Sequence, residues 1–141
     1  MRIVLGADAL VCEWLARTQG LEVPQHPRLI LAIADRDQLV GAFVIVWHHN
    51  RTAELSIYGT VSQETVKQMF RTVFEQYQVY RLEVRTEKNN KAIRRAAPKY
   101  GFSFEHTARH YYGPNRHAFV YSMIPEQCRW LKRHGLTVQN A

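Results

Sequence analysis

The sequence predicts an α+β fold in which helices flank a mixed, mostly antiparallel central sheet. Three strand patterns follow one another between residues 28 and 60, separated only by short polar turns. A long helix with one apolar stripe follows at 62–77, and a strand, a helix and a hairpin occupy 79–124. Strands joined by short turns pair antiparallel, and a one-sided helix must bury its stripe, so helices packed on a sheet are expected.

The first half of the chain predicts a strand, a helix and a three-stranded meander. Residues 2–5 read as a short strand, and Asp8 is a candidate N-cap for a helix that Gly20 ends. The meander is predicted from alternating and β-branched residues between turn sequences, at 28–34, 39–49 and 53–60.

The second half predicts helices with clear caps. Ser62 is the expected N-cap of helix 62–77, whose apolar stripe runs from Val66 to Tyr77. Strand 79–85 comes next, and Asn89 or Asn90 then caps a helix with Gly101 just beyond its end. The chain is expected to close with a hairpin, 102–112 and 117–124 around turn 113–116, and a short helix, 125–135.

Length and composition indicate one domain, residues 1–141, large enough for its own core. No apolar run approaches the ~20 residues of a membrane span, and the N-terminus lacks the apolar core of a signal peptide. We therefore expect no membrane association and a location in the cytoplasm, or in the virion if a phage encodes the protein. Cys12 and Cys128 are expected to be reduced thiols.

The basic charge is concentrated in the second half. Residues 81–141 hold twelve Lys or Arg against four Asp or Glu, a net charge of +8, whereas residues 1–80 hold seven against eight, a net charge of −1. Such asymmetry favours an anionic partner, which is a phosphorylated cofactor, nucleic acid or an acidic protein, although a solvated basic face is equally compatible. The seven histidines show no metal-ligand spacing, so no metal site is predicted.

The segment "NKAIRRAAPKYGF" lies between a strand and the closing hairpin, with Asn90 before its helix and Gly101-Phe102 opening the next strand. In this segment and in the order of its elements the chain resembles the GCN5-related N-acetyltransferase (GNAT) superfamily. The opening "MRIVLGADALVCEWLART" and the compact size are similar to small phage and prophage members. The resemblance implies that strands 53–60 and 80–85 splay apart into a V-shaped cleft.

The resemblance also implies acetyl-CoA as cofactor, with its pantetheine arm paired along strand 53–60 like an added strand. Backbone amides around Ile57 and Gly59 would polarise the thioester carbonyl. The pyrophosphate would lie at the start of the next helix, where N–H groups and the helix dipole attract anions. Asn90 would face the lower arm of the cofactor, and Arg94 would contribute to pairing with its 3′-phosphate. The residues implied at the helix start are Ser62, Gln63, Glu64 and Thr65.

Candidate catalytic residues precede the cofactor segment. Glu54 shares one strand face with Ser56 and Tyr58, and a carboxylate here is the usual base of the superfamily, acting directly or through water. His48 is a candidate proton relay. The alternative for Glu54 is an ordinary strand residue that faces solvent. The alternative for His48, and for its neighbour His49, is an ordinary histidine at the end of a strand.

Three departures from the superfamily pattern leave a second hypothesis open. The pyrophosphate loop is "TVSQET", which has no glycine and carries Glu64 beside the expected phosphates. Ala97 stands where a tyrosine commonly protonates the leaving thiolate, and Pro98 removes a hydrogen bond from the same helix. One hypothesis is direct acetyl transfer to an unknown amine. The other is a degenerate scaffold that acts as a structural or interaction protein, for example in a phage particle.

Two further groups of side chains allow more than one role. A basic stripe is predicted on helix 91–99, opposite Ala92, Ile93 and Ala96, and it fits a cofactor phosphate, nucleic acid, an acidic partner or solvent. Tyr111 and Tyr112 fit cross-strand packing or a substrate slot. The stripe consists of Lys91, Arg94, Arg95 and Lys99.

Overall fold

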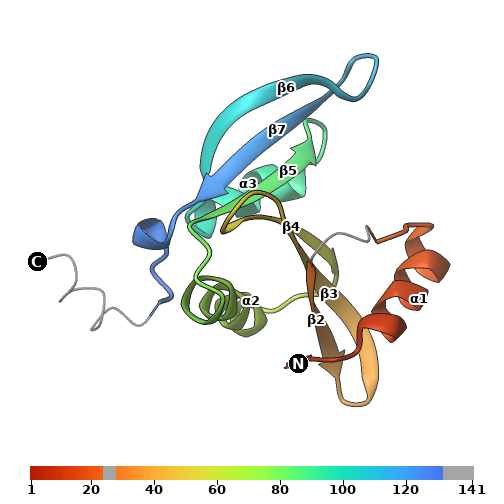
Figure 1. Ribbon diagram of the computed structural model, residues 1–141. Coiled ribbons are helices and arrows are strands. Elements are labelled where there is room, and N and C mark those ends of the chain that lie inside the picture. Colours follow the sequence, from red (N-terminus) through yellow and green to blue (C-terminus); the bar gives the residue numbers. More distant parts are fainter. Residues whose placement is uncertain (24–27, 132–141) are drawn as a thin grey trace, which may run out of the picture.

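A computed structural model describes residues 1–23 and 28–131 and confirms the predicted α+β class (Figure 1). One seven-stranded sheet has the strand order β1-β2-β3-β4-β5-β7-β6. The strands are β1 (Arg2–Val4), β2 (Arg28–Asp35), β3 (Gln38–Trp47), β4 (Thr52–Gly59), β5 (Arg81–Glu87), β6 (Ser103–Gly113) and β7 (Arg116–Met123). The α-helices are α1 (Asp8–Gln19), α2 (Gln63–Arg71) and α3 (Lys91–Lys99).

The predicted meander is confirmed, because β2, β3 and β4 pair antiparallel in sequence order. The strand predicted at 39–49 ends earlier, at Trp47. His48 and His49 lie in the turn that leads into β4, where the backbone N–H of His48 donates to the Thr52 carbonyl at 2.9 Å. The prediction that both histidines lie inside the strand was therefore wrong. The chain turns after Trp47, and the residues of the turn are not part of the β3–β4 pairing.

The N-cap of helix α1 lies one residue earlier than predicted, so the helix begins at Asp8 itself. Ala7 occupies the N-cap position, and Asp8 is the first helical residue, where its carboxylate still lies at the positive end of the helix dipole. Gly20 ends the helix as predicted. It adopts the left-handed conformation with φ of +63°, which glycine reaches without steric cost, and its N–H donates to the Leu15 carbonyl.

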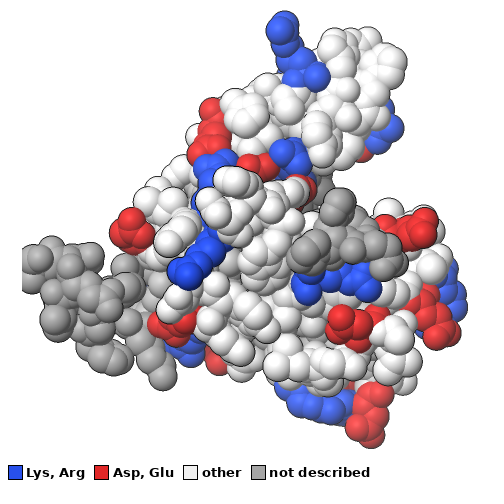
Figure 2. All heavy atoms as spheres, viewed as in Figure 1, with Lys and Arg blue, Asp and Glu red and all other residues white. Residues whose placement is uncertain are grey.

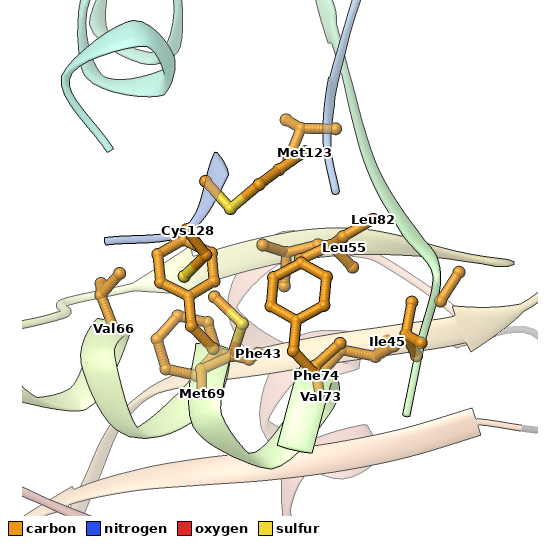
Figure 3. Close-up of a cluster of buried hydrophobic side chains, with 14 of the residues drawn as sticks. Phe43, Ile45, Leu55, Val66, Met69, Val73, Phe74, Leu82, Met123 and Cys128 are labelled. Atoms are coloured by element: carbon orange, nitrogen blue, oxygen red, sulfur yellow. The ribbon is translucent and has the colours of Figure 1, made fainter. Parts of the chain in front are cut away.

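The two faces of the sheet bury different helices, as the alternation along β2 and β3 requires. Ile30 and Val44 face a smaller cluster that includes Val11 and Leu15 of α1. The neighbouring positions face the main core, which Figure 3 shows packed against α2. Phe43 and Ile45 of β3 belong to this core, together with Val66, Met69 and Phe70 of α2.

The helix predicted at 62–77 is one helical segment with a change of pitch. It is α-helical to Arg71 and then continues as a π-helical turn over Thr72–Gln76. Val73 and Phe74 remain buried, but Tyr77 lies beyond the turn and is 40% exposed, with its ring edge-on to Trp47. The inserted π turn shifts the register of the apolar stripe, so extending the stripe to Tyr77 was wrong.

The closing hairpin is confirmed, but the final helix is not. Only Pro125–Gln127 form a helical turn, of the 3₁₀ type, where the prediction placed a helix over 125–135. Residues 132–135 lie outside the described part of the chain. Trp130 and Leu131 do pack against the main core as expected, Leu131 being 6% exposed.

The predicted opening between strands 53–60 and 80–85 is confirmed. Strands β4 and β5 run parallel and pair at only three positions, Thr52 with Arg81, Ala53 with Leu82 and Glu54 with Glu83. Beyond Glu54, β5 stays paired with β7 as far as Glu87, and β4 stays paired with β3. In Figure 1 the β6–β7 hairpin and β5 lean away from the rest of the sheet, so the strands form a V. Each arm exposes backbone groups at the point of divergence.

Asn90 is the predicted cap of α3, and we expect its loss to weaken this helix. Its side-chain oxygen accepts from the backbone N–H of Ile93 at 3.3 Å. Asn90→Ala is expected to lower the free energy of unfolding by about 1 kcal/mol, measured by urea denaturation. Asn89→Ala, one position earlier in the turn, is the control and should be close to neutral. Equal losses in the two variants would contradict a capping role.

Candidate active site

Two cavities meet at the outer half of β4. One, of about 360 Å³, lies in the gap between β4 and β5. The other, of about 340 Å³, lies on the α1 side of the sheet beside β3. The residues that line both are Glu54, Ser56, Tyr58 and Tyr111. This shared wall confirms that Glu54, Ser56 and Tyr58 lie on one strand face, and it makes β4 the boundary between the two cavities.

Glu54 and His48 contact each other at this boundary. His48 Nε2 lies 3.1 Å from Glu54 Oε1 across the β3–β4 turn. An ionised carboxylate only accepts hydrogen bonds, so Nε2 carries the hydrogen and Nδ1 is left with a lone pair. The two predicted catalytic residues therefore form one pair, although they were predicted independently of each other.

Arg85 of β5 spans the V and holds Glu54 from the opposite arm. One guanidinium nitrogen, Nη1, donates to Glu54 Oε1 at 2.9 Å, and the other, Nη2, donates to Glu83 at 2.6 Å. The guanidinium also lies 4.5 Å from the centre of the Tyr111 ring. Burial favours the neutral form of Arg85, but the charge of Glu54 and the Tyr111 phenol outweigh it and raise the pKa of the guanidinium. Arg85 thus fixes the carboxylate against the cavity wall.

A second ion pair extends this contact toward the sheet edge. Arg81 donates to Glu83 at 2.9 Å and to Glu105 of β6 at 2.7 Å, and Ser122 also donates to Glu105 at 2.7 Å. Hydrogen bonds from Arg81 and then Ser122 lower the pKa of Glu105 to about 2. The pair ties the projecting hairpin to β5.

The lowered pKa of Glu105 predicts a dependence of stability on acid. A carboxyl whose pKa is lower in the folded than in the unfolded protein stabilises the fold above its unfolded pKa, 4.5, and loses that contribution as pH falls toward 2. The Glu105 side chain is 34% exposed, so screening limits the effect to about 1 kcal/mol or less. We expect Glu105→Gln to be less stable than the natural protein at pH 6 and indistinguishable from it near pH 2, by urea denaturation across this range. A constant difference would contradict the assignment.

Tyr112 places a third phenol, beside those of Tyr58 and Tyr111, in the cavity between β4 and β5. Burial, reinforced by the neighbouring Tyr111, raises the pKa of Tyr112 above its ordinary value. Like any tyrosine at neutral pH, Tyr112 carries its phenolic proton and can donate a hydrogen bond. The same cavity is lined by Ile57 and Asn90, two of the residues that the resemblance assigns to the cofactor.

The start of α2 differs from the phosphate site that the resemblance implies. Ser62 and Thr65 form a reciprocal capping box, in which each side-chain oxygen accepts from the other residue's backbone N–H, at 3.2 and 3.0 Å. Thr65 is fully buried, so its side chain is not available to a ligand. Gly59, with φ of +73°, serves a close approach of β4 to β3, because a Cβ there would lie 2.4 Å from the Val40 carbonyl oxygen. Glu64 is exposed in the first turn.

A basic groove of about 380 Å³ lies beside this helix start. Gln63 of α2 and Arg95 and Lys99 of α3 line it, with Arg129 from the C-terminal segment. The predicted stripe on α3 is therefore divided. Arg94 lies elsewhere, 4.6 Å from the centre of the Phe119 ring and bonded to the Lys88 carbonyl. Ala92 and Ala96 line the groove with the basic residues, so placing them opposite the stripe was wrong.

Sequence reasoning missed three residues of this region. Arg85 and Arg129 were counted in the basic half but had no assigned place, and Tyr112 was not assigned to the cavity between β4 and β5. The only local signal for Arg85 was its alternation with Arg81 and Glu83 along β5, which places the three side chains on one face.

On the face that Figure 2 shows, the basic side chains do not gather into one surface. Figure 2 shows Lys and Arg interspersed with Asp and Glu over the described residues of the visible face. Nucleic acid or an acidic protein as partner thus stays a prediction. Neither Cys12 nor Cys128 forms a disulfide. Among the described residues, no helix has the length and apolarity that a membrane span requires.

The splayed pair β4 and β5, with the flanking helices on both faces, defines the fold of the GCN5-related N-acetyltransferases. No protein-family profile and no curated protein matches the sequence. The structure matches an aminoglycoside 6′-N-acetyltransferase from Enterococcus faecium with a TM-score of 0.68 and 12% identity, over 88% of this chain and 97% of that one.

Other solved structures with the same fold are longer than this chain. A GCN5-related N-acetyltransferase from Brucella melitensis matches with a TM-score of 0.64 and 24% identity, over 86% of this chain and 60% of that one. A spermidine N-acetyltransferase from Vibrio cholerae matches with a TM-score of 0.65 and 15% identity, over 89% of this chain and 77% of that one. The chain thus spans less than two thirds of the Brucella protein, and the likeness establishes the fold.

Proposed function

We propose that the protein is an acetyl-CoA-dependent N-acetyltransferase that transfers the acetyl group directly to an amine. The observation that carries the proposal is the contact of Glu54 and His48 on the wall shared by two cavities, one of them in the gap between β4 and β5. A donor and an acceptor bound in adjoining spaces would meet at this wall. The names of the structures with the same fold support the same reaction class.

The residues present fit acetyl-CoA, although by a different distribution of contacts from the one predicted. The outer half of β4 has a backbone edge that β5 leaves open, which suits the amide-containing pantetheine arm. The capping box occupies the amides of Ser62 and Thr65, so the anion-binding capacity at the helix start is reduced. The groove with Arg95, Lys99 and Arg129 supplies the positive charge for phosphates instead.

His48 and Glu54 would remove the proton that makes an ammonium unreactive. When bound, acetyl-CoA supplies an activated acetyl group as a thioester. His48 Nδ1 has the free lone pair that accepts the proton, while Glu54 holds Nε2–H and stabilises the resulting imidazolium. Arg85 keeps Glu54 in place from the other arm of the V, and it acts as a positioning residue. The deprotonated nitrogen would then attack the thioester carbonyl as the C–S bond breaks.

Tyr112 is the proposed proton donor to the departing thiolate. It lines the β4–β5 cavity, and like any tyrosine it is protonated at neutral pH. This places the donor on β6, whereas the superfamily position on the helix is Ala97 here. A donor from another element would compensate for one of the three departures seen in the sequence.

A second candidate is a scaffold that keeps the fold without catalysis. The capping box at the start of α2 favours it, because it consumes donors that a pyrophosphate would use. Calorimetric titration with acetyl-CoA separates the two candidates. We expect a Kd below about 100 μM, which corresponds to about −5.5 kcal/mol. No heat at millimolar acetyl-CoA would favour the scaffold.

A paired variant shows whether binding uses the basic groove. Arg95→Ala combined with Lys99→Ala is expected to weaken acetyl-CoA binding by about tenfold or more, because two charge-assisted contacts to phosphate are lost. The control, Lys88→Ala combined with Lys91→Ala, removes the same charge from residues that do not line the groove and should bind normally. Equal weakening in both would mean that net charge alone attracts the ligand.

A further inference from the structure

The hairpin of β6 and β7 is irregular at its tip, residues 109–117. The strands pair as far as Ala108, and the register shifts before the next pair, Gly113 with Arg116. Within the tip, His110 and Asn115 have φ of +57° and +58°. Residues other than glycine adopt this left-handed conformation only rarely, so contacts at the tip must favour it.

Two imidazole rings supply these contacts. The backbone N–H of His110 donates to His117 Nδ1 at 2.8 Å, and the backbone N–H of Asn115 donates to His110 Nδ1 at 2.9 Å. The two rings also lie edge to face, with their centres 4.9 Å apart. A ring nitrogen that accepts a hydrogen bond carries no hydrogen, so each imidazole is neutral and has its hydrogen on Nε2. The irregular tip thus depends on two hydrogen bonds that only neutral histidines can make.

The same tip contributes two residues to the wall of the cleft. Tyr111 and Tyr112 directly follow His110 in the chain. Tyr111 lines both cavities, and Tyr112 lines the one between β4 and β5. Arg85 Nη1 donates to the phenol oxygen of Tyr111 at 3.1 Å. A change in the backbone at His110 is therefore passed on to the two side chains that follow it, both of which line the cleft.

A protonated imidazole at the tip would have no carboxylate partner. Within residues 1–23 and 28–131, His48 is the only histidine that pairs with a carboxylate. Glu87, at the end of β5, is hydrogen-bonded to Arg116 of the hairpin. Glu54 is hydrogen-bonded to Arg85. The charged side chains of the tip and of the elements beside it include Arg85, Glu87, Lys88, Arg94, Arg109 and Arg116. Protonation thus removes hydrogen bonds without gaining an ion pair.

We propose that His110 and His117 are positioning residues, which hold Tyr111 and Tyr112 in the cleft wall only while both imidazoles are neutral. Histidine changes its charge between about pH 5 and 8. A proton on Nδ1 turns the acceptor into a donor that faces the N–H of His110 or Asn115. The closed tip has no proton on either Nδ1, and the open tip takes up one on each ring. The closed form is therefore favoured at high pH and is lost as pH falls.

The inference concerns the cleft wall and does not depend on acetyl transfer, so the first test uses the protein alone. NMR measures the protonation of the ring nitrogens and the exchange protection of the His110 and Asn115 amides between about pH 8 and 5. We expect protection of both amides to fall about fivefold or more as each Nδ1 gains its proton. The contact between the Tyr111 ring and Arg85 should weaken at the same pH. Amides that are unprotected near the upper pH, or that stay protected after the rings are protonated, would overturn the inference.

The second test replaces both histidines, as His110→Asn with His117→Asn. An Asn side-chain oxygen accepts a hydrogen bond without titrating, and Asn tolerates the left-handed conformation at position 110. We expect this variant to keep its tip amides protected down to about pH 5. Loss of protection with falling pH, as in the natural protein, would contradict the role of the imidazoles. A variant unprotected at every pH would do so as well, because a neutral acceptor would then not suffice.

His106→Asn is the matched control. His106 lies on the same strand, β6, but its ring takes no part in the two hydrogen bonds of the tip. This variant should show the same loss of protection with falling pH as the natural protein. A His106→Asn variant that no longer responds to pH would assign the response to another part of the hairpin and overturn the inference.

Discussion

Replacing Glu54 by Gln is expected to lower kcat/KM for acetyl transfer by about 100-fold or more, since a positioned acid–base group contributes factors of this size. The amide has nearly the same shape and still accepts from Arg85, so the wall of the two cavities stays intact. The negative charge that stabilises a protonated His48 disappears, however. A pure loss of turnover with acetyl-CoA binding unchanged is the expected result, measured by thiol release and calorimetry.

Glu105→Gln is the control for this experiment. It removes the same charge from the same set of ion pairs, but Glu105 lies on β6 and lines neither cavity. At neutral pH it should retain normal turnover despite its small loss of stability. A similar fall in both variants would show that the ion pairs support the fold and that Glu54 has no chemical role.

Truncating Phe70 to Ala is expected to have the largest effect on stability. Phe70 is 1% exposed, and its ring lies 5.9 Å from that of Phe102 and 6.2 Å from that of Phe74, between centres. Loss of a buried aromatic ring with incomplete collapse of the cavity costs about 3–5 kcal/mol. For a domain of this size, the melting temperature should fall by roughly 10–20 °C, as measured by calorimetry.

Leu10→Ala on α1 is the control for the Phe70 variant. Leu10 is 65% exposed, so its truncation should change the melting temperature by only a few degrees. If Phe70→Ala were as mild as Leu10→Ala, the packing of α2 on the sheet would not be the main source of stability. Because Phe70 also approaches Phe102, at the end of the segment "PKYGF", this contact links the start of the hairpin to the same core.

The helix caps show what local sequence predicts well. Ser62 and Asn90 were assigned from short-range patterns, and both accept the predicted hydrogen bond from an N–H three residues on. The π turn after Arg71 was missed, because the periodicity of α2 continues into it without a break in residue type. The early end of the final helical turn, at Gln127, was also missed. An amphipathic pattern predicts a helix over its whole length, even where the chain stops being helical after one turn.

The candidate site shows the limit of the same reasoning. The strand face of Glu54, Ser56 and Tyr58 follows from the two-residue period of a strand. The contacts of Arg85 with Glu54 and the position of Tyr112 in the cleft depend instead on where β5 and β6 lie in the sheet. No pattern along the chain specifies that Tyr112 lines the cavity between β4 and β5.

The sequence by itself determined the order of the elements, the N-caps of α2 and α3 and the antiparallel meander, because these depend on residues within a turn or two of one another. Only the tertiary structure decided that β4 and β5 pair at three positions and then part. That geometry arises because β4 remains in the ladder of β3 while β5 remains in the ladder of β7. These pairings join residues far apart in the chain, so the packing of the whole sheet decides between them. The cleft opens where β4 and β5 follow their different partners.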